Sequence, residues 1–330
     1  MNTVTQENKK FLGQENKRFV IELIKNSMVF IALVVLFMVF SITLSDVGNG
    51  FSHPDNLWNI IRQTSLIAIL SVGMSFALAA GQIDLSMGAV VAVTGLTSAL
   101  VLRSYGIVPA IFAGLSVGVI VGALNGFLVA YVGMPAFLAT LGTMITFQGV
   151  ARTITSLKSI PITNQTFINI FGGGNLENIP VLVIWMIVFL IIGHIMLRKT
   201  PFGRKVLAIG GNRRSALYSG INVKRTIFTV MVFSGLLASA VGILWAGRYG
   251  GGRYTIGDGS ELSAIAASVL GGTSIMGGIA SVLGAGAGAI MIGMIDSALV
   301  MYGLDVYQQM IVRGIVIIIA VATTHKRRDI

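Results

Sequence analysis

The chain has 330 residues, of which 55% are hydrophobic and only 11% are charged, and its formal net charge is +11. Soluble domains are about 25% charged, so the composition excludes an ordinary soluble protein and indicates an integral membrane protein, whose basic residues set topology rather than bind nucleic acid. The absence of cysteine and the wide spacing of the three histidines argue against a metal site, and we expect no cofactor.

Ten apolar segments follow one another along the chain, each bounded by polar or turn residues. Most have the length that an α-helix needs to cross a bilayer, and backbone in lipid must satisfy its hydrogen bonds within the helix. We therefore predict an all-α, polytopic integral membrane protein with about ten transmembrane helices and short or broken intramembrane segments. The segments cover residues 28–46, 58–80, 87–103, 107–131, 134–155, 179–197, 226–246, 262–279, 281–301 and 306–324.

The Lys and Arg residues predict the orientation. Sixteen of the 23 lie in residues 1–27, 198–225 and 325–330, and cytoplasmic loops carry an excess of these residues. We therefore predict a cytoplasmic N-terminal tail (1–27), a transmembrane domain (28–324) with a cytoplasmic loop at 198–225, and a cytoplasmic C-terminal tail (325–330).

Two similar breaks interrupt the apolar segments. GQIDLSMG (81–88) and GGTSIMGG (271–278) have glycines at the same spacing and small, apolar flanks. Interrupted segments in corresponding halves of a transporter often mark the substrate pathway, and a carboxylate that faced lipid would be costly. The alternative is that both breaks are hairpin turns with no role in binding. The candidate pathway residues are Gln82, Asp84, Ser86, Thr273 and Ser274.

The loop 198–225 carries eight basic residues and no acidic one, and a short helix is encoded in it. Asn212 is a favourable N-cap, residues 213–219 make about two helical turns, and Gly220 suits the left-handed position that follows a helix. So short a helix is unstable alone in water, so we expect it to dock on a partner. The alternative is a plain loop that only sets topology.

Two charged residues lie inside predicted spans near the end of the chain. Asp296 falls in segment 281–301 and Arg313 in segment 306–324, and each would be costly alone in lipid. Because a short hairpin joins the two segments, we predict a structural ion pair. The alternative is a proton or ion relay, but the spans carry too few further carboxylates for a chain, which argues against an ion-driven pump.

Several stretches resemble the permease subunit of ribose-type ABC sugar importers. They are GQIDLSMGAVVAVTG (81–95), FLATLGTM (137–144), GRKVLAIGGN (203–212) followed by SGINV (219–223), LSAIAASVLGGTSIMGG (262–278) and YQQMIVRG (307–314). They occur in the family's order and span most of residues 56–314. The chain departs from the family pattern at Gln82, where glycine is usual, in NRRSA (212–216), and at Asp296 and Ser297, where many relatives have two asparagines.

The resemblance implies the transmembrane subunit of an ATP-driven, binding-protein-dependent importer of a small sugar, a pentose or a hexose. It implies a bacterial inner membrane, with both termini cytoplasmic, and three kinds of protein partner: a second copy of the chain, cytoplasmic ATP-binding subunits and an extracytoplasmic sugar-binding protein. The chain would then be no enzyme itself. Gly284, Gly286 and Gly288 offer the homodimer a close-packing face. Loops 156–178 and 247–261, which we predict on the outer side, are either docking surfaces for an external partner or ordinary connecting loops.

For the loop 198–225, the resemblance implies the coupling helix that sits in a groove of the ATPase. An acidic surface there would offset the unfavourable position of Arg213 and Arg214 at the positive end of the helix dipole. From sequence alone two other functions stay open: a stand-alone secondary transporter with internal repeats, and a gated channel. The coupling-helix residues are Asn212, Arg213, Arg214, Ser215, Ala216, Leu217, Tyr218, Ser219 and Gly220.

Overall fold

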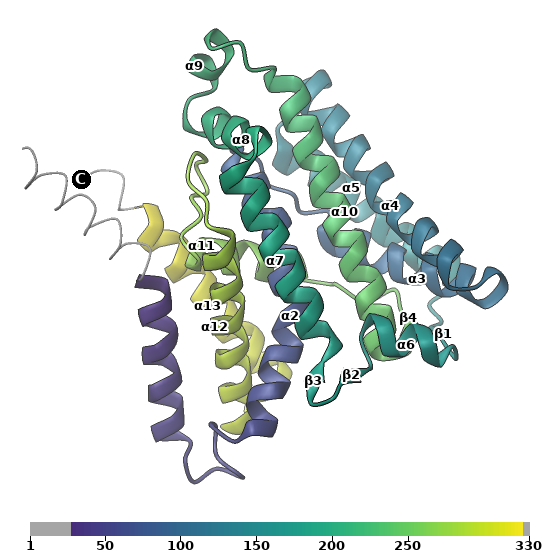
Figure 1. The fold of residues 1–330 in the computed structure, drawn as a ribbon, viewed down its shortest axis with the longest axis vertical. Helices are drawn as coiled ribbons and strands as arrows, with labels where there is room; N and C mark the ends of the chain where they lie inside the picture. The colour runs from purple at the N-terminus through teal and green to yellow at the C-terminus, as the bar shows by residue number, and fades with distance from the viewer. Residues whose placement is uncertain (1–27, 326–330) are drawn as a thin grey trace, which may run out of the picture.

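The computed structural model describes residues 28–325, and Figure 1 shows them as a bundle of helices. The predicted tail 1–27 and, apart from His325, the predicted tail 325–330 lie outside the described residues. Nearly all the regular structure in the described range is helical, which confirms the all-α membrane fold.

The elements follow one another with short connections. In chain order they are an unlabelled helix at Met28–Thr43, α2 (Pro54–Ala79), α3 (Met87–Tyr105), α4 (Ile107–Phe127), the π-helix η1 (Leu128–Val132), α5 (Ala136–Thr155), β1 (Ile160–Pro161), α6 (Gln165–Phe171), β2 (Asn175–Leu176), β3 (Ile179–Pro180), α7 (Val181–Lys199), α8 (Pro201–Gly211), α9 (Arg213–Tyr218), α10 (Val223–Tyr249), β4 (Gly251–Gly252), α11 (Ser260–Leu270), α12 (Val282–Met301) and α13 (Val306–His325).

Each of the ten predicted segments contains a helix, but not all of them are long spans. Within residues 28–325, six helices are long and apolar enough to cross a membrane: α2, α3, α4 with η1, α7, α10 and α12. The segment 262–279 is a short helix followed by the predicted break, since α11 has 11 residues and ends at Leu270. Gly272 then takes a φ of 89°, a conformation that cannot continue a right-handed helix.

The centre of the bundle is formed by α2 and α10. Every residue of α2 from 68 to 79 is buried. Small residues at every fourth position let membrane helices approach closely, and α4 carries such a row against α10. A Cβ at Gly118 would overlap the Gly235 carbonyl oxygen, and one at Gly122 would lie 2.6 Å from the Met231 carbonyl oxygen. This seam fixes the position of α10 beside α4.

The glycines of α12 likewise allow close packing against other helices of the same chain. A Cβ at Gly284 would overlap the Gly271 carbonyl oxygen, and one at Gly288 would overlap the Ala267 carbonyl oxygen. At Gly286 a Cβ would lie 2.9 Å from the side chain of Leu190 on α7. The prediction that these three glycines form a homodimer face is therefore wrong, because α7, α11 and the loop after α11 already cover them.

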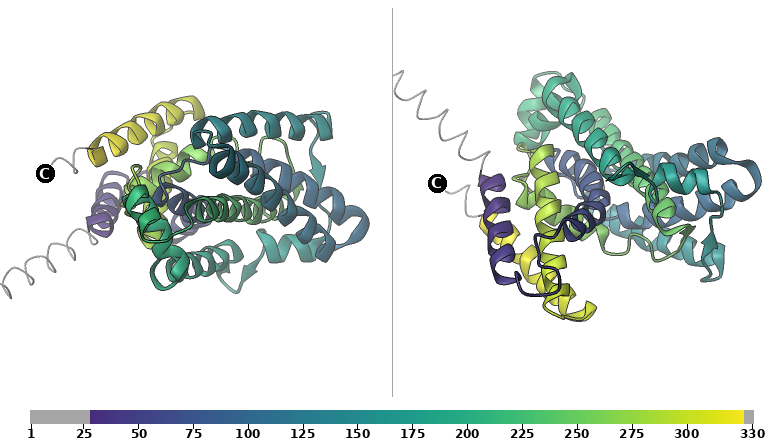
Figure 2. Two further views of the ribbon diagram at one scale, coloured as in Figure 1. Left: turned by 90° about the horizontal axis from the view of Figure 1, so that it is seen from above. Right: turned by 60° about the horizontal axis from the view of Figure 1, so that its bottom comes forward.

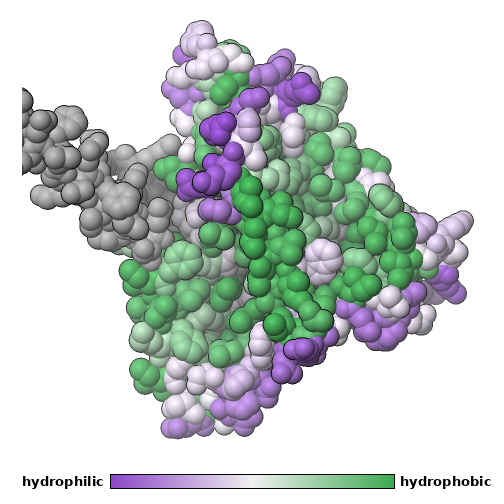
Figure 3. All heavy atoms as spheres, in the orientation of Figure 1, coloured by the Kyte–Doolittle hydropathy of each residue, from purple (hydrophilic) through white to green (hydrophobic). Residues whose placement is uncertain are grey.

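The surface is divided by polarity along the long axis. In Figure 3 a hydrophobic band crosses the middle of the visible face, and hydrophilic residues gather at both ends. Figure 1 places α8 and α9 at one end and the loop before α2 at the other. In the left view of Figure 2, α5 and α13 lie on the side of the bundle opposite α7. The arrangement suits a chain that crosses a membrane with α8 and α9 outside the hydrocarbon.

The two loops predicted on the outer side contact each other. β1 pairs antiparallel with β4, with Ile160 opposite Gly252 and Pro161 opposite Gly251. The first loop also contains α6, capped by the Asn164 side chain, which accepts from the Phe167 N–H at 3.0 Å. These loops therefore form one ordered surface, at the end of the bundle away from α9 (Figure 1).

Candidate functional site

The first break joins α2 to α3. Gly81 has a φ of 71°, which is accessible to glycine at little cost. The Gln82 N–H donates to the Ala77 carbonyl at 2.9 Å and closes the end of α2. The chain then turns back into the bundle, and α3 begins at Met87, whose side chain packs near Gly73 of α2.

The Asp84 carboxylate lies in this break and is fully buried. It accepts three hydrogen bonds: from the Ser86 N–H at 3.0 Å, from the Ser86 hydroxyl at 2.6 Å, and from the Ser234 hydroxyl on α10 at 2.5 Å. A buried carboxylate is tolerated only when such donors surround it. The bonds tie the first break to α10.

A chain of hydrogen bonds continues from Ser86 to two more helices. The Asn125 side-chain amide on α4 donates to the Ser86 oxygen at 2.8 Å, and the Thr143 hydroxyl on α5 donates to the Asn125 amide oxygen at 2.8 Å. The Leu85 N–H donates to the hydroxyl oxygen of Thr140 on α5 at 3.1 Å. We call Asp84, Ser86, Asn125, Thr143 and Ser234 the polar latch, because together they hold the first break against α4, α5 and α10.

Sequence reasoning found only two members of the polar latch. Asp84 and Ser86 stand out because they interrupt an apolar run. Ser234 and Thr143 do not stand out, since hydroxyls are common in membrane helices, where they can bond to their own backbone. Asn125 is the missed member that the sequence could have identified, because a lone amide inside the apolar helix α4 needs a buried hydrogen-bond partner.

The second break follows α11 and is held against α2. The Thr273 side chain is fully buried; its hydroxyl oxygen accepts from the Ser281 N–H at 3.3 Å and lies 3.4 Å from the Ser75 hydroxyl oxygen on α2. Ser274 is partly exposed, and its N–H donates to the Ile279 carbonyl at 2.9 Å. The Gly278 N–H donates to the Ala79 carbonyl at 3.0 Å, where the first break begins.

The five candidate pathway residues therefore lie at one end of α2 but not in one cavity. Asp84 and Ser86 face α10 and α4, whereas Thr273 faces α2. Gln82 instead lines a cavity of about 310 Å³ near the start of α9. That cavity is lined by Gln82, Val129, Ala130, Tyr131, Gly133, Met134, Pro135, Ala136, Arg213, Lys224 and Ile227.

The predicted short helix is present as α9. The Asn212 side chain accepts from the Ser215 N–H at 3.0 Å, and Gly220 has a φ of 78°, which confirms the predicted cap and the predicted left-handed glycine. α9 ends at Tyr218, with Ser219 as its C-cap. Ala216 packs inward, whereas 60% of Leu217 and 88% of Tyr218 are exposed. α9 therefore presents an apolar and aromatic tip to the outside.

Sequence reasoning missed the helix before it. α8 begins with Pro201 at its first position, and the Thr200 hydroxyl oxygen accepts from the Gly203 N–H at 3.2 Å. Thr followed by Pro is a helix-start signal. Asn212 is both the C-cap of α8 and the N-cap of α9, so one residue joins the two helices.

The structure locates the two helices of the predicted ion pair but does not test the contact between the two side chains. Asp296 lies on α12, and position 313 lies on α13. The side chain of Arg313 is outside the described side chains, so the ion pair stays a prediction.

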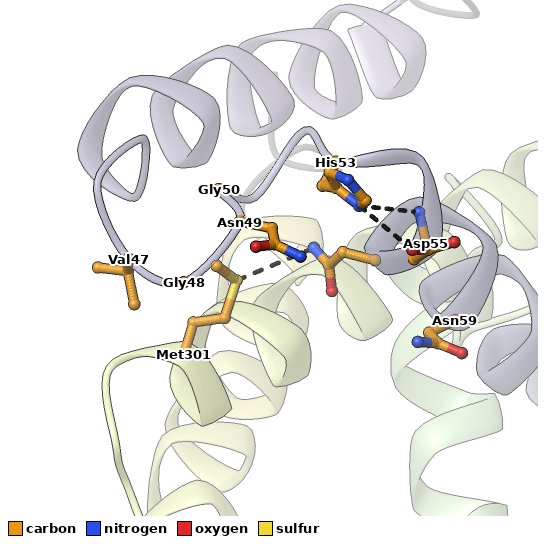
Figure 4. A pocket seen from close by; sticks show the side chains of 9 residues that line it. Val47, Gly48, Asn49, Gly50, His53, Asp55, Asn59 and Met301 are labelled. Atoms are coloured by element: carbon orange, nitrogen blue, oxygen red, sulfur yellow. Dashed lines mark hydrogen bonds and ion pairs between the residues drawn. The ribbon is translucent and has the colours of Figure 1, made fainter.

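A second cavity lies beside the loop before α2 (Figure 4), and Figure 1 places this loop at the end of the bundle opposite α9. It has a volume of about 230 Å³ and is lined by Val47, Gly48, Asn49, Gly50, His53, Asp55, Asn56, Asn59 and Met301. Figure 4 shows His53 beside Asp55, and the Asp55 N–H donates to the His53 ring nitrogen at 3.4 Å. None of the candidate pathway residues lines this cavity.

Comparison with known proteins gave consistent matches. A family model described as "Branched-chain amino acid transport system / permease component" matches residues 56–321. The ribose import permease protein RbsC of Bacillus subtilis is 36% identical over 301 residues, which cover 90% of this chain and 92% of that protein. The L-arabinose ABC transporter permease protein AraH of Azospirillum brasilense is 33% identical, covering 93% and 90%. The D-allose transport system permease protein AlsC of Escherichia coli is 35% identical, covering 82% and 84%. No solved structure matched the chain.

Proposed function

Because the chain belongs to the permease-component family whose model matches residues 56–321, we propose that it is the membrane-spanning subunit of an ATP-driven importer of a small sugar. Relatives named as permeases for ribose, L-arabinose and D-allose support a pentose or a hexose as the substrate. The sequence has no G-x-x-x-x-G-K-[ST] phosphate-binding loop, so a separate ATP-binding subunit supplies the energy and this chain is no enzyme.

The exposed tip of α9 is the observation that carries this proposal. A six-residue helix gains its order from packing rather than from its own hydrogen bonds. Exposed Leu217 and Tyr218 beside exposed Arg213 and Arg214 match a groove with an apolar floor and an acidic rim. A few well-buried aromatic and apolar residues contribute most of the free energy of such an interface. The ATP-binding subunit is the partner that offers this groove.

The polar latch is the gate in this proposal. Its hydrogen bonds hold the first break shut against α4, α5 and α10, with Asp84 sealed from solvent. ATP binding shifts the equilibrium toward a form in which this break and the second break separate. Gln82, Asp84, Ser86, Thr273 and Ser274 then line the pathway in the open form.

A second copy of the chain completes the pathway. The latch is tied to α5 through Thr143, and the second break follows α11, which packs beside α13. α5 and α13 lie on one side of the bundle (Figure 2) and expose large apolar side chains there, such as Ile145 and Ile311. A homodimer formed through this side brings both breaks of each copy to a shared axis.

The orientation follows from the basic loop that contains α8 and α9. With this loop in the cytoplasm, both termini are cytoplasmic in a bacterial inner membrane. The paired outer loops that contain β1 and β4 then face the sugar-binding protein.

The substrate can be tested in the native host. Cells without this chain are compared with the same cells complemented with it, using labelled ribose, L-arabinose, D-allose and leucine. We expect at least tenfold more uptake of one sugar on complementation and unchanged uptake of leucine. Uptake of leucine alone would contradict the sugar and favour the amino acids in the family description.

A further inference from the structure

The end of α8 touches both intramembrane breaks through glycine backbone alone. A Cβ at Gly210 would overlap the carbonyl oxygen of Ala79, the last residue of α2, which leads into the first break. A Cβ at Gly277, in the second break, would lie 2.8 Å from the Gly210 Cα and from its carbonyl oxygen. Since no side chain separates these segments, they meet backbone on backbone at one point.

The two breaks are also bonded to each other at this point. The Gly278 N–H donates to the same Ala79 carbonyl that Gly210 covers, at 3.0 Å. In the last turn of α7, just before α8, the Arg198 guanidinium donates to the Ala280 carbonyl, just after the second break, at 3.4 Å. Displacement of α8 toward the bundle would therefore strain both breaks together.

The link from α9 to this contact is short and stiff. Asn212 alone joins the helices: its N–H donates to the Ala208 carbonyl of α8, and its carbonyl accepts from the Ala216 N–H of α9, both at 3.0 Å. Phe202 near the start of α8 stacks on Phe76 of α2, with ring centroids 5.8 Å apart. A force on α9 thus reaches Gly210 without a flexible linker to absorb it.

We propose that Gly210 is a positioning residue for transport, at which movement of α8 and α9 is passed to both intramembrane breaks through direct backbone contact. The inference rests on the proposed function, because it requires a partner that moves α9. It assigns to Gly210 and Gly277 a role in coupling, separate from docking of the partner and from binding of the sugar.

The chain offers a matched control for each variant. Gly210→Ala inserts a Cβ into the contact, whereas at Gly211 the nearest atom to a Cβ is the Gly278 Cα at 4.0 Å. Gly277→Ala strains a φ of 90° and presses on Gly210, whereas Gly106→Ala, between α3 and α4, strains a φ of 84° with no atom within 4 Å. The first pair has the same change in helix propensity, and the second pair has the same backbone strain. Within each pair, only one variant adds a contact at the junction.

The measurement is sugar imported per ATP hydrolysed, by complexes purified from native membranes and placed in liposomes. We expect Gly210→Ala and Gly277→Ala to lower this ratio at least tenfold while the ATP-hydrolysing partner still co-purifies within twofold of wild type. Gly211→Ala and Gly106→Ala should keep the wild-type ratio. A wild-type ratio in Gly210→Ala, or a loss of the partner that matches the loss of transport, would overturn the inference.

A crosslink tests the contact if Gly210→Ala does not accumulate in the membrane. Gly211→Cys with Gly278→Cys places two thiols at the junction in a chain without other cysteines, because a Cβ at Gly278 would lie 2.8 Å from the Gly211 Cα. We expect oxidation to abolish uptake, and a reductant to restore it, while ATP hydrolysis continues. Absence of the crosslink, or full uptake in the crosslinked complex, would contradict the inference. A wild-type complex with no ATP-hydrolysing partner would instead contradict the proposed function.

Discussion

At the scale of single residues, the fate of Asp84 shows what a sequence can and cannot predict. A carboxylate in an apolar run predicts a special environment, because lipid would not tolerate it. Its partner Ser234 lies 150 residues away along the chain, and nothing in the spacing pairs them. The sequence located two of the five residues of the polar latch, and the fold supplied the other three.

Asp84→Ala should impair transport while insertion into the membrane stays near normal. The substitution removes the acceptor of three hydrogen bonds and leaves two buried hydroxyls without it. Ser234→Ala removes one donor and should lower stability by about 1–3 kcal/mol, read as a lower melting temperature in detergent. Ser116→Ala, on the exposed face of α4, is the control. Wild-type uptake in both Asp84→Ala and Asp84→Asn would leave the break as a turn only.

At the scale of elements, local signals located α9 and failed for α8. Asn212 and Gly220 define α9 through caps that act within a few residues. α8 contains three glycines, which weaken a helix, and its contacts with α2 and the second break override that weakness. A local signal also ends α11. The apolar run continues past Leu270, but the helix stops there because Gly272 takes a left-handed backbone conformation.

Charge reversal on α9 should weaken docking of the ATP-binding subunit. Arg213→Glu with Arg214→Glu places four units of charge difference at the tip, and an acidic partner surface would repel it. Arg204→Glu with Lys205→Glu makes the same change on exposed α8 residues and is the control. We expect at least a tenfold loss of co-purified ATP hydrolysis for the α9 pair alone, and weaker wild-type association at high salt. Equal effects of the two pairs would reduce the loop to a topology signal.

At the scale of the whole molecule, the basic loop at one end of the bundle predicts which end faces the cytoplasm. Ser215 lies on α9, and Asn175 lies in the loop 156–178; both are exposed. Because the chain has no cysteine, a cysteine at either site can be labelled selectively. An impermeant thiol reagent added to intact spheroplasts should label Asn175→Cys and spare Ser215→Cys. The reverse pattern would overturn the orientation and the assignment of α9 to an ATPase.

The dimer makes a separate prediction about the two sides of the bundle. Ile145 on α5 and Ile191 on α7 are exposed to 61% and 51%, and α5 and α7 lie on opposite sides of the bundle in Figure 2. Ile145→Cys should form a disulfide between copies in native membranes, and Ile191→Cys should not. A disulfide through Ile191→Cys on α7 instead would contradict a dimer formed through the side of α5 and α13.

Sugar accumulation with and without the ATP-hydrolysing partner tests the central claim most directly. The purified complex and the chain alone are placed in separate liposomes, with the sugar that the cell assay identifies. We expect accumulation against a gradient only in the complex, only with ATP and with the sugar-binding protein present. Accumulation by the chain alone on a proton or sodium gradient would identify a secondary transporter, and simple equilibration by the chain alone would identify a channel; either result would contradict the account.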